Sequence, residues 1–278
     1  MPEKYVDLHI HSFFSDGTMS PGEIVAEAKA RNVGLIALSD HNVLEGSRQI
    51  RQLCREAGVG YIPAVELDCL DGGNGYHVLS YGADPDNPQF LDMVKRDRFL
   101  LDEMSVILIR KMSREIPGIS ISDFEGFSHD KRLGGWKALQ YLVHKGITKT
   151  LKEGIPLYSR YDCPYTIVDF PSMQQTCKTI HQAGGFAVLA HPAENIPAEN
   201  IGQFRHRLTE LIETGLDGIE CHYPSHSEAV TSVCTGSCRE RDLIITAGSD
   251  CHGGFGRTTI GQTRTTLNEV NLKGIRPL

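Results

Sequence analysis

Short apolar runs that end in polar residues recur along this chain, and stretches with helical spacing separate them. The runs are rich in β-branched and aromatic residues, a composition typical of strands. Seven strands are expected, over Tyr5–His11, Gly34–Ser39, Gly60–Glu66, Gly75–Tyr81, Gly185–His191, Gly218–His222 and Leu243–Ser249. Strands that alternate with helices in this way predict an α/β fold.

Helix signals lie between these strands. The run from Ser20 to Glu23 has the spacing of a capping box, with a proline at the first helical position, so a helix is expected to begin there. Further helices are expected over Glu45–Ala57, Ser172–Ala183, Asn200–Thr214 and Ser227–Arg241.

The alternation stops between Asp84 and Tyr165. Helices are expected near Pro88–Arg114 and Trp136–Lys145, and no segment of this region continues the alternation of strands and helices. We therefore expect residues 1–84 and 166–278 to form one barrel, and residues 85–165 to form an inserted, mainly helical subdomain that caps the substrate. A chain of 278 residues suits this organisation, because barrels of alternating strands and helices run to roughly 250 residues.

Composition restricts the partners of the chain. Hydrophobic residues make up 40% and charged residues 23%, and no segment approaches the roughly 18 apolar residues of a membrane span, so no membrane partner is expected. The first residues lack the order of a secretory signal, which predicts a cytoplasmic protein with reduced cysteines. A net charge of −7 argues against a stable nucleic-acid partner, because phosphate backbones are bound mainly by Lys and Arg.

Histidines and carboxylates gather at the ends of the predicted strands. In the run from Asp7 to His11, His9 and His11 point to the same face of a strand. Three more runs follow, namely Ser39-Asp40-His41, Ala190-His191-Pro192 and Gly248-Ser249-Asp250-Cys251-His252. Because the carboxyl ends of barrel strands converge on one rim, these runs predict a single metal site.

The four motifs, in this order, resemble the PHP family, named for polymerase and histidinol phosphatase. The resemblance covers residues 5–81 and 185–254. Within the family the chain is most similar to the small bacterial metal-dependent phosphoesterases that act on nucleotide and ribose phosphates. This resemblance implies a distorted (β/α)₇ barrel with an inserted helical subdomain.

The resemblance also implies nine metal ligands. His9, His11, Glu66 and Asp250 would surround a first ion, Glu66, His77 and His191 a second, and Asp16, His41 and His252 a third. Asp16 precedes a glycine and is also a candidate turn residue. Asp40 is a candidate catalytic residue, which either caps a helix or orients a ligand histidine, and we favour the second role.

The donor chemistry narrows the cofactor to two or three divalent ions. Six imidazoles with three carboxylates suit Mn, Fe or Zn better than Mg. Closely spaced ions lower the pKa of a bridging water and neutralise a phosphate, so attack by a metal-bridging hydroxide needs no serine or cysteine nucleophile.

Candidates for substrate binding come from two loops. The phosphoesterases that the chain resembles carry an Arg and a His in the insertion that meet the substrate phosphate. The equivalent stretch here, from Lys131 to Lys137, does not keep this pattern. Arg132 and Lys137 are the candidates to bind phosphate in its place. Trp136 either stacks on a base or packs in the core. His222 and His226 lie beyond a strand end, and each either meets phosphate, protonates the leaving oxygen or stabilises the loop.

The sequence thus predicts a metal-dependent phosphoesterase acting on a small phosphate ester, either a nucleotide-type monoester or a cyclic ribose phosphate. Two alternatives remain open at this stage. One is a histidinol-phosphate phosphatase, and the other is a non-catalytic PHP module that binds metal.

Overall fold

The computed structural model describes residues 3–278, and its centre is a sheet of seven strands that lie in chain order. The strands are β1 (Tyr5–Asp7), β2 (Val33–Leu38), β3 (Gly60–Asp71), β4 (Asn74–Tyr81), β5 (Phe186–Leu189), β6 (Gly218–His222) and β7 (Ile244–Ala247). All seven predicted strands are present. β1, β5 and β7 are shorter than predicted, β2 and β6 have the predicted length, and β3 and β4 are longer, with β3 extending beyond Glu66.

The directions of the strands interrupt the expected alternation at one place. β1, β2 and β3 are parallel, as are β5, β6 and β7, but β4 is antiparallel to both of its neighbours. β3 and β4 form a hairpin whose turn contains Gly72 and Gly73, both at positive φ, a conformation that glycine adopts without steric cost. As a result, Glu66 lies inside a strand, whereas the sequence placed it at a strand end.

Hydrogen bonds connect the two ends of the sheet. Leu8 N donates to Ala247 O at 2.9 Å, and Asp250 N donates to His9 O at 2.8 Å. These bonds join the segment after β1 to the segment around β7, so the residues after both strands meet at one rim. The predicted α/β fold, a distorted barrel of seven strands, is confirmed.

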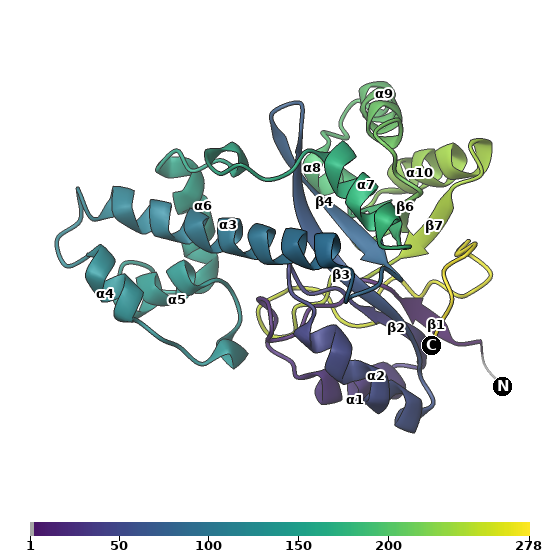
Figure 1. Cartoon of the computed structure of the whole chain (residues 1–278), viewed down its shortest axis with the longest axis horizontal. Helices are drawn as coiled ribbons and strands as arrows, with labels where there is room; N and C mark the ends of the chain where they lie inside the picture. The colour runs from purple at the N-terminus through teal and green to yellow at the C-terminus, as the bar shows by residue number, and fades with distance from the viewer. Residues whose placement is uncertain (1–2) are drawn as a thin grey trace.

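Helices cover the outside of the sheet (Figure 1). They are α1 (Pro21–Ala30), α2 (Glu45–Ala57), α7 (Met173–Gln182), α8 (Pro192–Asn195), α9 (Ile201–Ile212) and α10 (Glu228–Glu240). The predicted capping box is present, because Ser20 accepts from Glu23 N and the Glu23 side chain accepts from Ser20 N. The bounds of α2 match the prediction, and the other predicted helices shift by one or two residues at their ends.

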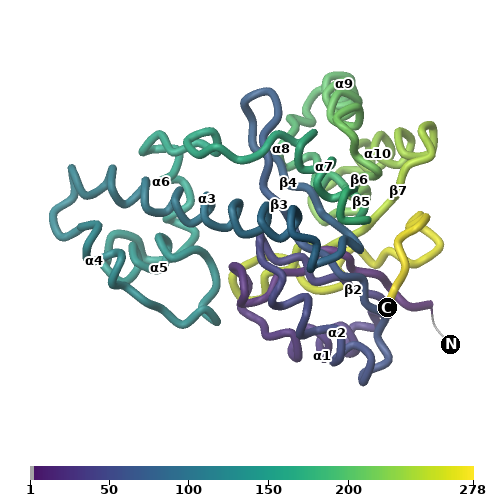
Figure 2. Tube along the Cα trace, viewed as in Figure 1, coloured from purple at the N-terminus to yellow at the C-terminus, as the bar shows by residue number. Residues whose placement is uncertain are grey.

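The helices between β4 and β5 project to one side of the barrel (Figures 1 and 2). They are α3 (Pro88–Met112), α4 (Ile121–Gly126), α5 (Lys137–His144) and α6 (Leu151–Arg160), with short 3₁₀ turns at Lys131–Leu133 and Tyr165–Ile167. Leu108, Phe124 and Tyr141 belong to a hydrophobic cluster formed within this region. The sequence did not indicate α6, which contains Gly154 and Pro156, two residues unfavourable to helices. The division of the chain into a barrel and a capping subdomain remains a prediction.

The cysteines and the C-terminal segment both pack against the barrel or within the fold. All eight cysteines are free and buried, as expected of reduced thiols. Near the C-terminus, Leu278 N donates to Tyr61 O, so the last segment runs along the barrel (Figure 2). Among residues 3–278, no helix has both the length and the apolar character needed to cross a membrane.

Candidate metal centre

The nine residues that the sequence proposes as ligands converge on one rim of the barrel. Their donor atoms fall into three groups in which all atoms lie within 4.8 Å of one another. The groups are His9, His11, Glu66 and Asp250; His11, Asp16, His41 and His252; and His41, Glu66 and His77. The ninth residue, His191, joins them through Glu66, at 3.0 Å between Nε2 and Oε1.

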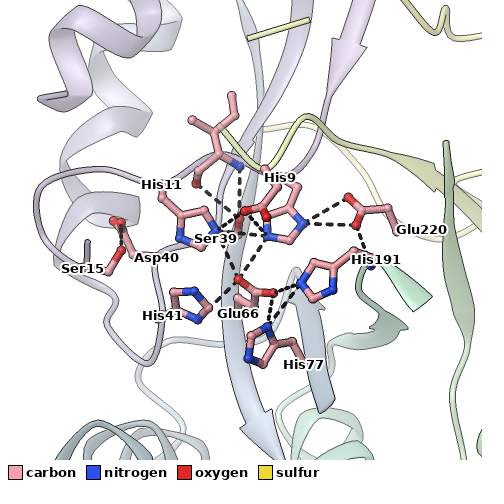
Figure 3. Close-up of polar contacts among 12 residues, drawn as sticks. His9, His11, Ser15, Ser39, Asp40, His41, Glu66, His77, His191 and Glu220 are labelled. Carbon is pink, nitrogen blue, oxygen red and sulfur yellow. Dashed lines mark hydrogen bonds and ion pairs between the residues drawn. The ribbon is translucent and has the colours of Figure 1, made fainter. Parts of the chain in front are cut away.

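Glu66 lies at the middle of these groups and is fully buried (Figure 3). Its Oε2 lies 3.0 Å from His9 Nε2 and 3.1 Å from His11 Nε2. Its Oε1 lies 3.0 Å from both His77 Nδ1 and His191 Nε2. The two oxygens of one carboxylate therefore face two different sets of imidazoles, which is the geometry of a bridging ligand.

The pKa of Glu66 reflects these neighbours. Burial by itself raises the pKa of a carboxylate, but the neighbouring imidazoles, with the charge of His9 as the largest of their effects, override it and hold the pKa well below its usual range. In contrast, burial lowers the pKa of His41 to about 4. Glu66 is thus anionic and His41 neutral near pH 7, which are the forms that bind metal ions.

The first predicted group also includes Asp250. Its Oδ1 lies 3.0 Å from His11 Nε2 and 3.4 Å from His9 Nε2, while the two histidine Nε2 atoms are 3.0 Å apart. Three donor atoms therefore point at one another across a small, buried space. A shared cation would satisfy all three at once.

The third predicted group lies on the other side of His11. His252 Nε2 is 3.2 Å from Asp16 Oδ1, and the rings of His11 and His252 stack with centroids 4.0 Å apart. Asp16 lies in a turn, and its carboxylate points to His252, so it has both the turn position and the ligand position that the sequence allowed.

Unsatisfied buried atoms support a metal at these groups. His11 Nδ1, Asp16 Oδ1, His41 Nδ1 and Asp250 Oδ1 are buried without a hydrogen-bond partner. Buried polar atoms are rarely left unpaired, because the loss of hydration costs free energy. Imidazole nitrogens and carboxylate oxygens that face one another in this way fit divalent cations.

The backbone is constrained where two of these residues lie. His191 and Asp250 have positive φ values of 26° and 52°, which are uncommon for residues with a side chain and occur often at functional sites. Gly248 faces His9 and Glu220 so closely that a Cβ atom would overlap both side chains. Only glycine therefore allows β7 to bring Asp250 to the centre.

A further layer of residues orients the histidines, and the sequence analysis missed it. The carboxylate of Glu220, on β6, accepts a hydrogen bond from His9 Nδ1 at 3.1 Å and another from His191 N at 2.8 Å. Asp68 lies opposite His77 in the β3–β4 hairpin, with Oδ1 3.2 Å from His77 Nε2. Both carboxylates are fully buried. Partners of this kind fix the ring orientation of metal-binding histidines.

A signal for these two residues exists in the sequence. Glu220 interrupts an otherwise apolar strand, and glutamate is almost never fully buried without a partner. Asp68 follows Glu66 by two residues and so shares its face of the strand. Two tyrosines carried no such signal, namely Tyr165, whose OH is 3.1 Å from His77 Nε2, and Tyr223, whose OH donates to Asp250 Oδ2 at 3.0 Å.

Asp40 is placed differently from the prediction. One of its oxygens accepts from Ser12 N and Ser15 Oγ, and the other from Ser12 Oγ, each at 2.7 Å. Figure 3 shows the contact with Ser15. Its hydrogen bonds therefore hold the loop between His11 and Asp16 in place and orient no histidine ring. This bonding occupies both oxygens of the buried carboxylate, and the catalytic role of Asp40 remains a prediction.

The two histidines after β6 have different surroundings. The β-ladder is irregular between Glu220 and His222, and the charges that affect His222 are those of Glu269 and Arg239, away from the metal-binding residues. His226 Nδ1 donates to Cys221 O at 3.1 Å, and its Nε2 is buried without a partner. The Nε2 atom of His222 is also buried without a partner, but the charges that act on His226 include those of Glu220 and His191, so His226 is the candidate of the two that lies beside the centre.

Arg132 and Lys137 do not reach the metal-binding residues. Arg132 pairs with Glu23 at 2.7 Å, with both side chains about half exposed. Lys137 Nζ donates to Glu125 O at 3.1 Å and lies 4.8 Å from the centre of the Phe124 ring. Each cation is thus engaged within or beside the helical insertion, and phosphate binding by Arg132 or Lys137 remains a prediction.

A cavity of about 500 Å³ opens directly onto the centre. Asp16, His41 and His77 form its floor, and the opposite side comes from the helical region, including Trp136, whose ring centroid is 5.5 Å from that of His41. A volume of this size is typical of sites for small molecules. The helices between β4 and β5 therefore contribute to the space next to the candidate metal centre.

The fold and the donor set together define a barrel protein with a multi-histidine centre for several cations. The PHP domain model matches residues 7–214 of the chain. The chain therefore belongs to the PHP domain family. Glu220, Asp250 and His252 lie beyond the matched segment and come to the centre through β6 and β7.

Two curated relatives match along nearly the whole chain. A 5'-3' exoribonuclease from Haemophilus influenzae is 27% identical over 276 residues, with 97% of each chain covered. A 3',5'-nucleoside bisphosphate phosphatase from Chromobacterium violaceum is 26% identical over 286 residues, with 98% of each covered.

A solved structure supports the fold. It is a putative metal-dependent phosphoesterase from Bifidobacterium adolescentis, 23% identical, with a TM-score of 0.78 over 96% of this chain and 94% of that one. At this identity the likeness establishes a shared architecture.

Proposed function

We propose that this protein is a metal-dependent phosphoester hydrolase that acts on a small phosphate ester. The observation that carries the proposal is the position of Glu66, whose two oxygens face separate sets of imidazoles at 3.0 and 3.1 Å. Both named relatives are enzymes that cleave phosphoester bonds. Bound divalent ions at such a centre would activate water and neutralise the charge of a phosphate.

The protein's own residues position this chemistry. His9 and His11 on the segment after β1, and Asp250 after β7, would hold one ion, while His77 and His191 would hold a second across Glu66. Asp16, His41 and His252 would hold a third. Manganese, iron and zinc all suit the six imidazoles and three carboxylates of this set.

His226 is the residue we propose to contact the phosphate or to protonate the leaving oxygen. Its ring is fixed by the hydrogen bond from Nδ1 to Cys221 O, and it lies beside Tyr223, whose OH donates to Asp250. The free Nε2 is thus held near the centre without a protein partner. A histidine in this position is suited to general acid catalysis.

Two features favour a small substrate over a nucleic acid. The cavity at the centre has a volume of about 500 Å³, and the chain carries a net charge of −7. A relative is named an exoribonuclease, however, so RNA with a 5'-phosphate belongs among the substrates to be tested. We propose a nucleotide-type monoester first and a cyclic ribose phosphate second.

The decisive experiment is a substrate screen with metal-loaded protein. Protein purified without chelator and supplied with Mn²⁺ is tested on phosphate monoesters, cyclic diesters, histidinol phosphate and short 5'-phosphorylated RNA, while bound metal is measured by elemental analysis. We expect two or more ions per chain and hydrolysis of a small monoester. Release of histidinol, or processive loss of nucleotides from RNA, would assign the alternative activities. Metal binding without hydrolysis of any of these substrates would favour the alternative of a non-catalytic PHP module that binds metal.

A further inference from the structure

The cavity beside the candidate metal centre has two unlike sides. One side consists of the metal-binding residues Asp16, His41 and His77. The other side is mainly apolar and aromatic, with Leu101, Met104, Trp136, Leu139, Ile155 and Phe255. Of residues 3–278, none of those lining this cavity is a lysine or an arginine. A phosphate placed at the centre would therefore direct the rest of its molecule against apolar side chains.

The cations of the helical region lie elsewhere. Arg98, Lys131 and Lys137 line a different cavity of about 450 Å³, which shares Trp136 with the first. Arg98 lies over the Trp136 ring at 5.4 Å and binds both oxygens of Asp102. Arg98 is thus paired with Asp102, Lys137 Nζ donates to Glu125 O, and none of the three cations lines the cavity at the centre.

Negative charge is present at the apolar side. Asp162 lines the cavity and its side chain is 94% exposed, while Lys111 Nζ donates to its backbone oxygen and lies 3.9 Å from its carboxylate. A second phosphate held there would meet this carboxylate, whose charge Lys111 already offsets, and would find no lysine or arginine among the residues that line the cavity. Such an arrangement disfavours substrates with two charged ends.

We infer that the preferred substrate carries a single phosphate on an uncharged leaving group with an aromatic or apolar face. This inference rests on the proposed function and narrows its substrate class. The leaving group would pack against Trp136 and the helix side chains, where base or ring stacking and apolar burial favour binding. A substrate with a second phosphate gains nothing in this cavity, so the chain would differ in specificity from its relative that hydrolyses nucleoside bisphosphates.

Two matched pairs of substrates test the inference on the metal-loaded protein. The first pair is adenosine 5'-monophosphate and adenosine 3',5'-bisphosphate, which differ by one phosphate. The second is 2-phenylethyl phosphate and ribose 5-phosphate, both primary alkyl esters. We expect kcat/KM to be higher by about tenfold or more for the first member of each pair. Equal values, or a preference for the bisphosphate or the sugar phosphate, would overturn the inference.

A charge inserted at the mouth of the cavity gives a second test. Ile155 lines the cavity and is 51% exposed, so Ile155→Lys is compatible with folding. It should shift the ratio of kcat/KM values toward adenosine 3',5'-bisphosphate by about threefold to fivefold, the effect of one partly exposed charge. Ile155→Gln controls for polarity, and Ile147→Lys, at a 36% exposed isoleucine lining another cavity, controls for net charge. An unchanged ratio in Ile155→Lys would contradict the inferred path of the leaving group.

The outcomes separate this inference from the proposed function. If no phosphate ester is hydrolysed with any divalent ion, the proposed function fails and the inference fails with it. If hydrolysis occurs but the bisphosphate or ribose 5-phosphate is preferred, the phosphoesterase stands and only the inferred substrate class is wrong.

Discussion

The barrel rim and the helical region line the same cavity, but the rim contributes polar, ionisable side chains and the helical region contributes mainly apolar ones. On the barrel side, buried carboxylates and imidazoles are held by further buried carboxylates such as Glu220 and Asp68. On the helical side, side chains such as Leu101 and Ile155 present apolar surface, and charged side chains lie behind or beside it. Under the proposed function, bond cleavage and substrate choice would depend on separate parts of the chain, so each could be changed without the other.

The largest expected effect is on the barrel side, at Glu66. Glu66→Gln keeps the shape of the side chain but removes the charge that faces both sets of imidazoles. We expect turnover to fall by about 10³-fold, because the charge arrangement at the reacting phosphate is lost. Elemental analysis should show the loss of at least one metal equivalent per chain. Near-normal turnover with full metal content would refute a bridging role.

Substitutions of His226 and His222 test which histidine of the barrel side contacts the leaving group. His226→Ala should lower kcat by about 10²-fold, a typical loss for a general acid, with metal content unchanged. His222→Ala is the matched variant, since His222 faces Glu269 and Arg239, and it should leave kcat near wild type. A larger loss in His222→Ala than in His226→Ala would reverse the two assignments.

Glu220 is expected to act on metal binding through His9. Glu220→Gln removes the charge that orients the His9 ring and should weaken metal affinity by about 10-fold to 100-fold. The measurement is metal retention during titration with a chelator, with circular dichroism as a check on folding. Glu240→Gln, on the exposed surface of α10, serves as the control. If chelator titrations of Glu220→Gln and wild type coincide, the carboxylate serves the fold alone.

The smallest effect is expected from the cations of the helical region. The sequence suggested Arg132 and Lys137 as phosphate contacts, but the structure pairs the first with Glu23 and places the second on Phe124. Arg132→Ala and Lys137→Ala should therefore change kcat/KM by about twofold or less on the best substrate, as expected for partly exposed charges. A tenfold loss in either variant would return that residue to the substrate site and remove the contrast between the two sides.

The convergence of the proposed ligands was predictable because most of them lie within short motifs. His9 and His11 are two residues apart on an extended segment, so local spacing indicates that their side chains share a face. His77 was predicted to lie within a strand, and it does. The location of the predicted ligands at one rim follows from the order of the strands, which the alternating pattern also indicates.

Features that depend on three-dimensional packing were not predictable in the same way. The antiparallel direction of β4 follows from a tight turn at Gly72 and Gly73, which resembles many loops in sequence. The sequence around Asp40 is compatible with a catalytic, capping or orienting role, and it does not indicate the hydrogen bonds to Ser12 and Ser15. The directions of long, flexible cations such as Lys137 depend on partners that are distant from the motif, so sequence spacing carries no information about them.

The closure of the barrel has a consequence for how the protein matures during synthesis. Ser249 N donates to Asp7 Oδ1 across 242 residues, beside the bond from Asp250 N to His9 O. The proposed metal pocket is therefore unfinished on the ribosome until the final segments have emerged. Ions that bind the closed barrel more tightly than the open chain would favour the closed barrel by mass action, so metal supply would promote the last folding step.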